Sequence, residues 1–66
     1  IVIGRIMKTV KNESMQGLEL YFRTPKGIKA YWFYPNDVRV VPDDYITKML
    51  ENLQRRRLVK ISNYIG

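Results

Sequence analysis

Few side chains in this chain of 66 residues could carry out catalysis. Because histidine and cysteine are absent, the sequence cannot form a Ser–His pair, a cysteine nucleophile or a zinc site built from those ligands. The adjacent carboxylates Asp43 and Asp44 could act as an acid/base pair or bind a hard cation weakly. They also stand at the predicted start of a helix, where a carboxylate caps free backbone N–H groups. We therefore expect no enzyme, cofactor, metal or small-molecule substrate.

LELYFRT (18–24) and GIKAYWF (27–33) place aromatic side chains close to basic ones, a combination suited to binding. Proteins that bind single-stranded nucleic acid stack bases on aromatic rings and contact phosphates with lysine and arginine. The predicted nucleic-acid surface consists of Tyr21, Arg23, Lys26, Lys29, Tyr31 and Phe33. The alternative is that another strand or a second subunit covers this face.

A second basic group follows the predicted helix and comprises Arg55, Arg56, Arg57 and Lys60. These side chains could contact phosphates in a nonspecific, salt-dependent manner. They could equally complement the negative end of the helix dipole. The formal net charge of +6 favours acidic partners, of which nucleic acid is one, although a basic surface can also serve solubility alone.

Strands must position most of these residues, because apolar and polar side chains alternate over much of the chain. Proline and glycine in TPKGI (24–28) predict a three-residue hairpin loop at 25–27, with Thr24 opposite Ile28. Counting back from that loop defines two faces of the hairpin. The predicted core face holds Leu18, Leu20, Phe22, Trp32 and Tyr34. The predicted outer face holds Tyr21, Arg23, Lys29, Tyr31 and Phe33.

One amphipathic helix is predicted at about residues 43–57, starting at an Asp43 or Asp44 cap. Its apolar stripe consists of Ile46, Met49, Leu50 and Leu53. Strands are predicted over 1–10 and 38–41 and again at LVKIS (58–62), in the order β-β-β-β-α-β. The expected class is mainly β (α+β), in one domain of residues 1–66, with four to five strands in a small SH3-like barrel or a strongly bent antiparallel sheet. So small a chain also favours oligomerisation or residence inside a larger chain.

This strand-rich run with its tight hairpin resembles SH3-like and Tudor-like small barrels over roughly residues 1–46. The segment VVPDDYI (40–46) is similar to the Pro-x-x-Tyr segment near the end of SH3 domains. The Ala-Leu-Tyr-Asp-Tyr pattern and the paired tryptophan of signalling SH3 domains are missing, so no peptide-binding residue is carried over. The resemblance implies a module that binds nucleic acid, peptide or a partner subunit.

We expect a non-enzymatic interaction module, intracellular and either cytoplasmic or nuclear (nucleoid), whose partner is nucleic acid. The alternative is a protein-interaction or assembly module, part of an oligomer or larger complex, that uses the same aromatic face or the helix. No membrane association is expected, because the apolar opening IVIGRIM (1–7) is too short to span a bilayer.

Overall fold

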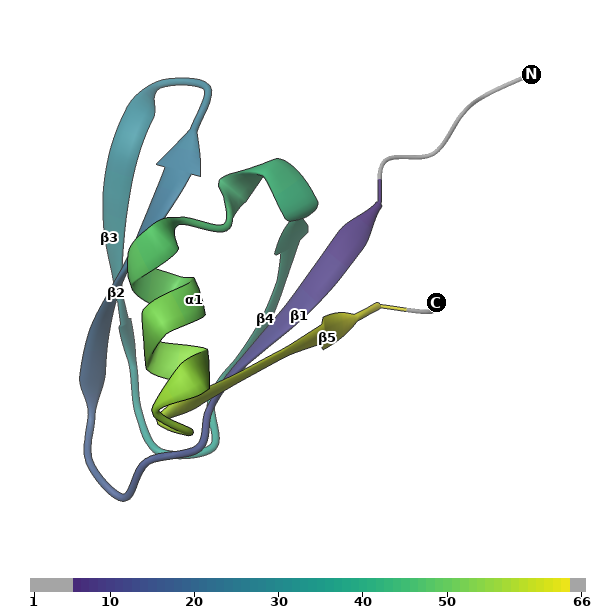
Figure 1. Cartoon of the computed structure of the whole chain (residues 1–66). Helices are drawn as coiled ribbons and strands as arrows, with labels where there is room; N and C mark the ends of the chain where they lie inside the picture. The colour runs from purple at the N-terminus through teal and green to yellow at the C-terminus, as the bar shows by residue number, and fades with distance from the viewer. Residues whose placement is uncertain (1–5, 65–66) are drawn as a thin grey trace.

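The computed structural model describes residues 6–64, and the first part of the strand predicted at 1–10 lies outside the described residues. Its elements in chain order are β1 (Met7–Asn12), β2 (Leu18–Thr24), β3 (Gly27–Phe33), β4 (Val38–Pro42), the 3₁₀ turn η1 (Asp43–Tyr45), α1 (Lys48–Arg55) and β5 (Val59–Asn63) (Figure 1). The predicted mainly β class with one helix and the order β-β-β-β-α-β are confirmed.

The strands form two antiparallel sheets, a three-stranded sheet in the order β4-β1-β5 and the hairpin β2–β3. Figure 1 shows α1 between the hairpin on one side and the three-stranded sheet on the other. Within residues 6–64 the strands do not close into a barrel, and the SH3-like resemblance stays a prediction. All three layers contribute to one core: Val10, Leu20, Phe22, Phe33, Val41, Leu50 and Val59.

Helix α1 begins later than the sequence predicts. Asp43 and Asp44 belong to η1, and Thr47 caps the helix: its Oγ1 accepts a hydrogen bond from Leu50 N at 3.3 Å. The predicted aspartate cap is therefore wrong, because the chain makes a 3₁₀ turn and an extended Ile46 before it becomes α-helical. Leu50 is buried, and Met49 and Leu53 of α1 pack against the core as predicted, whereas Ile46 packs against the core from the extended segment before the helix.

Arg57 ends the helix with a left-handed backbone, at φ 63°. Its N–H donates to Gln54 O and the N–H of Leu58 donates to Leu53 O, each at 2.9 Å, which is the hydrogen-bond pattern of a Schellman motif. Glycine usually occupies this position, because the conformation costs about 1–2 kcal/mol for a residue with a Cβ. The turn ends α1 before the predicted residue 57 and directs the chain into β5.

The β2–β3 loop has two residues, Pro25 and Lys26, and not the predicted three. Thr24 faces Gly27, whose φ of 103° suits glycine, and Thr24 Oγ1 donates to Gly27 O at 2.7 Å. The same oxygen accepts from Lys26 N at 3.2 Å. The threonine hydroxyl therefore closes the shorter loop, and glycine becomes the first residue of β3.

The observed β2–β3 register differs from the predicted one by a single residue, so each side chain of β3 lies on the opposite face from the one predicted. Leu20 faces Tyr31 and Leu18 faces Phe33, so Phe33 is fully buried. Trp32 and Tyr34 are 53% and 65% exposed. The predicted core positions of Trp32 and Tyr34 and the predicted exposure of Phe33 are wrong.

Candidate nucleic-acid interface

The side of the hairpin that faces away from the core is aromatic and apolar with a basic end. We call it the outer hairpin face. Its cross-strand pairs are Glu19 with Trp32, Tyr21 with Ala30, and Arg23 with Ile28. All six side chains are exposed. Lys26, in the loop at the same end of the hairpin as Arg23, is also exposed.

Trp32 lies over the backbone of Gly17, the residue just before β2. A Cβ at Gly17 would lie only 2.2 Å from Trp32 Cζ2, so the indole occupies space that any other residue at position 17 would fill. The ring of Tyr34 meets the indole edge-on, with 6.1 Å between ring centroids and 83° between planes. The aromatic pair is therefore supported by protein on two sides while half or more of each residue stays exposed.

The turn after β3 holds Tyr34 through its backbone. Tyr34 N donates to Asp37 Oδ2 at 2.8 Å, and Asp37 N donates to Tyr34 O at 3.0 Å. Asn36 takes the left-handed conformation at φ 70°, which asparagine tolerates better than most residues. The YPND segment is thus a tight turn, and it fixes the backbone next to the exposed tyrosine ring.

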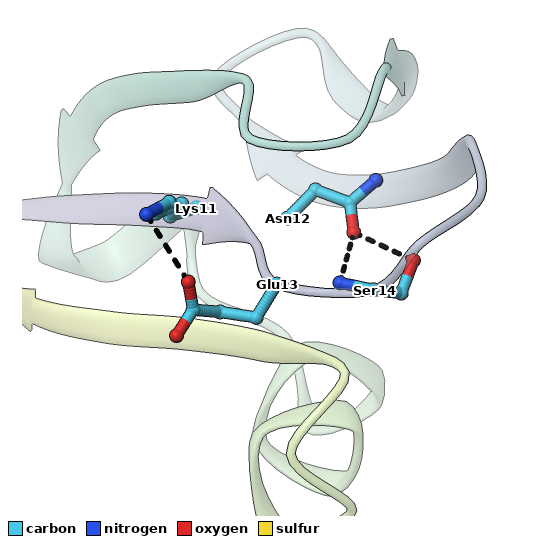
Figure 2. A network of polar contacts seen from close by, with 4 residues as sticks. All are labelled: Lys11, Asn12, Glu13 and Ser14. Atoms are coloured by element: carbon cyan, nitrogen blue, oxygen red, sulfur yellow. Dashed lines mark hydrogen bonds and ion pairs between the residues drawn. The ribbon is translucent and has the colours of Figure 1, made fainter.

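Asn12, a fully buried polar residue at the end of β1, fixes the loop that contains Gly17. Its Nδ2 donates to Gln16 O at 2.9 Å and to Phe33 O at 3.0 Å. Figure 2 shows its Oδ1 accepting two hydrogen bonds, from Ser14 N and Ser14 Oγ, both at 2.8 Å. The side chain joins the 13–17 loop to the end of β3, and so it sets Gly17 beneath Trp32.

Sequence reasoning missed Asn12. An asparagine followed two residues later by serine in a polar loop is a known signal for a local side-chain-to-backbone turn, and could have indicated the bond to Ser14. Nothing local indicates the bond to Phe33 O, because that residue lies 21 positions away.

Tyr21 carries a perturbed hydroxyl on the outer hairpin face. It donates to Glu19 Oε1 at 2.7 Å, and this hydrogen bond together with the negative charge of Glu19 raises the pKa of Tyr21 above its ordinary value. The bond holds the tyrosine ring along β2. Glu19 also places one negative charge opposite Trp32, which weakens the attraction of this end of the face for phosphate.

The predicted site residues divide between the two faces of the hairpin. Tyr21 and Arg23 lie on the outer hairpin face as predicted. Lys29 is exposed but shares the opposite face with Tyr31, which packs against the core, and with the buried Phe33. The Arg39 guanidinium lies 4.9 Å from the ring centroid of Tyr31 and 5.7 Å from that of Phe33. These two rings therefore already contact a protein cation and the core, and Trp32 and Tyr34 replace them as candidate stacking residues.

The second basic group lies outside the hairpin. Arg55 ends α1, Arg56 and Arg57 follow it, and Lys60 belongs to β5. Their side chains are exposed. Lys60 faces Lys11 across the β1–β5 pair, and Lys11 forms a 3.2 Å ion pair with Glu13 (Figure 2).

Comparison with protein-family models, curated proteins and solved structures finds no match for this chain. Residues 6–64 contain no cluster of carboxylate, imidazole or thiol side chains that could hold a metal ion. In the same part of the chain, no helix has the length and apolar character needed to cross a membrane.

Proposed function

We propose that this chain is a non-catalytic domain that binds single-stranded nucleic acid on its outer hairpin face. Bases stack on Trp32 and Tyr34, and Arg23 and Lys26 contact phosphates. The observation that carries the proposal is the half-exposed indole of Trp32, supported by Gly17 and by Tyr34. A preformed aromatic surface loses little conformational entropy when a base stacks on it.

The chemistry of this face supports a nucleic-acid partner. Stacking of a base on an aromatic side chain contributes about 1–3 kcal/mol, and it tolerates any base sequence. The net charge of +6 attracts a polyanion over a distance, while Arg23 and Lys26 stand near the loop end of the same face.

The angle between the two rings favours a single strand. Bases in a duplex lie parallel and are stacked on one another, whereas the Trp32 and Tyr34 rings lie 83° apart. A ligand that uses both rings must present bases in different orientations. Unstacked single-stranded segments do so, and paired segments do not.

Intrinsic fluorescence tests this proposal, because Trp32 is the single tryptophan of the chain. A thymidine oligonucleotide of about 12 nucleotides should quench Trp32 emission at low salt, and binding should weaken as salt rises. Arg23→Ala should reduce the affinity and the salt dependence, whereas Thr9→Ala on the three-stranded sheet should not. Unchanged emission at millimolar oligonucleotide, or equal effects of the two substitutions, would contradict the proposal.

A protein-interaction or assembly module is the second candidate, and Ile28 and Ala30 are the observation that favours it. Ile28 is 57% exposed and lies between Arg23 and the aromatic pair. Its aliphatic side chain offers no ring on which a base could stack, whereas it could pack against an apolar protein surface. Under this alternative, Ile28→Ser weakens binding to a protein partner. Nucleic-acid binding would then be weak and insensitive to Trp32→Ala.

A further inference from the structure

The two strands of the hairpin differ in what lies along their outer edges. β2 packs against η1 and α1, and Thr47 Oγ1 donates a 3.0 Å hydrogen bond to Tyr21 O from that side. The hydroxyl that caps α1 thus also covers the edge of β2. Among residues 6–64, β2 is the only strand that pairs with β3, so the other edge of β3 is open.

The hydrogen bond from Thr47 identifies which backbone groups of β3 point outward. Along an antiparallel pair of strands, facing residues alternate between hydrogen-bonded pairs, which exchange two backbone hydrogen bonds, and non-hydrogen-bonded pairs, which exchange none. Because Tyr21 O points away from β3, Tyr21 and Ala30 form a non-hydrogen-bonded pair. The N–H and C=O of Ala30 therefore point to the open edge, and alternation gives the same direction for those of Ile28 and Trp32.

β3 has few of the features that protect an edge strand from pairing. It contains no proline and no acidic residue, and its single charge is Lys29. β4, by contrast, ends at Pro42. An edge strand of seven residues with outward-facing backbone groups and exposed apolar side chains readily accepts another strand.

The sequence of β3 is complementary to itself about Ala30. In an antiparallel pair of two β3 strands centred there, Ala30 faces Ala30, Ile28 faces Trp32, and Lys29 faces Tyr31. Each lysine then faces the uncharged Tyr31 and not another lysine, and the small alanine lies at the two-fold axis. A pair centred on Lys29 would instead place two lysines in direct opposition, which is unfavourable.

We infer that two copies of this chain pair through β3, with the two-fold axis at Ala30. The Ile28, Ala30 and Trp32 positions supply the backbone hydrogen bonds, and the two hairpins become one four-stranded antiparallel sheet. The two outer hairpin faces then lie side by side on one surface. This pairing does not depend on what that surface binds.

Cysteine cross-linking tests the pairing, because the natural chain contains no cysteine. Facing residues of a hydrogen-bonded antiparallel pair have Cα atoms about 5.5 Å apart, within disulfide reach. Ala30→Cys should therefore form a disulfide-linked dimer at least about tenfold faster than Ser62→Cys, which changes a small exposed residue of edge strand β5. Equal rates for the two variants would overturn the inference.

Sedimentation gives a second test in the unlinked protein. From about 10 µM to 1 mM, the range of a weak specific pair, the mass of the natural chain should rise from 7.9 kDa towards twice that value. Ala30→Pro removes an outward N–H and should keep the monomer mass with an unchanged circular dichroism spectrum. A natural chain that stays monomeric at 1 mM, or a folded Ala30→Pro that associates equally well, would overturn the pairing. If Ala30→Pro does not fold, the cross-linking rates decide.

Discussion

Asn12→Asp is the sharpest test of how Asn12 holds the 13–17 loop, and with it Gly17, beneath Trp32. The two side chains have nearly the same shape, but a carboxylate cannot donate the hydrogen bonds that Nδ2 makes to Gln16 O and Phe33 O. Both carbonyls would then face a negative charge in a fully buried site. The bonds that Ser14 donates to Oδ1 would remain.

The cost of Asn12→Asp follows from these contacts. Two lost hydrogen bonds contribute about 1 kcal/mol each, and a buried, incompletely compensated charge adds several kcal/mol, so we expect a loss of about 3–5 kcal/mol at pH 7. A chain of this length has a free energy of unfolding of roughly 3–10 kcal/mol. The variant should therefore be partly or largely unfolded at pH 7.

The loss should shrink in acid. Burial against two carbonyls raises the pKa of the introduced carboxyl in the folded state above its unfolded value of about 4. The folded state then binds more protons than the unfolded state between the two pKa values, so the free energy of unfolding falls as pH rises through that window. Below pH 4 the neutral carboxyl can donate one of the two lost bonds, and most of the loss should disappear.

Urea unfolding of Asn12→Asp and of the natural chain, followed by circular dichroism at several pH values, measures this difference directly. Asn52→Asp on the exposed side of α1 is the matched control and should change stability by less than about 0.5 kcal/mol. A loss below 1 kcal/mol at pH 7, or one that is the same at pH 4 and pH 7, would refute the role assigned to Asn12.

Three further substitutions test neighbouring parts of the structure. Gly17→Ala should displace the indole, shift Trp32 emission to the red and weaken oligonucleotide binding. The control Gly27→Ala should lower the free energy of unfolding by about 1 kcal/mol, because of the positive φ at Gly27, and leave the emission unchanged. Similar emission spectra for the two variants would count against the Gly17 contact. Glu19→Ala removes both the hydrogen bond and the charge, so it should lower the pKa of Tyr21 towards its ordinary value, as followed by NMR, and strengthen oligonucleotide binding. An unmoved pKa would exclude Glu19 as the cause. Arg57→Gly should raise the free energy of unfolding, measured in urea, by about 0.5–1 kcal/mol, whereas the control Arg56→Gly should not raise it. Equal effects of the two substitutions would argue against backbone strain from the left-handed conformation of Arg57.

Local patterns in the sequence predicted the elements of the fold. The alternation in β2 identified Leu20 and Phe22 as core residues, and the three- and four-residue spacing in α1 identified Leu50. These assignments succeed because each depends on a period that is contained within one element. The four strands before the helix and the one after it follow from the same patterns and from the prolines and glycines between them.

Register and helix start were not predictable in this way, because more than one local solution fits the sequence. TPKG is compatible with loops of two or three residues, and the choice depends on the Thr24 hydroxyl and on burial of Phe33. The predicted register turns Tyr31 and Phe33 outward, whereas the observed register, shifted by one residue, turns Trp32 outward. Likewise, Asp43, Asp44 and Thr47 are all suitable helix caps, and the η1 turn decides between them.

Only part of the candidate site was predicted correctly, because the register error affects the residues of β3 but not those of β2. Tyr21, Arg23 and Lys26 lie on β2 and its loop, so the register error did not affect their placement. Trp32 belongs to the strand whose faces were inverted, and Tyr34 directly follows that strand. Their support by Gly17 and Asn12 depends on contacts between distant segments, which no local pattern contains.

The most direct test of the binding face is an NMR titration of the isotope-labelled chain with a single-stranded thymidine oligonucleotide of about 12 nucleotides. We predict the largest shifts at the Trp32 indole N–H and at the backbone amides of Tyr21, Arg23, Ala30 and Tyr34. Shifts confined to Arg55–Arg57 and Lys60, or no shifts at millimolar oligonucleotide, would contradict the assignment of nucleic-acid binding to the outer hairpin face.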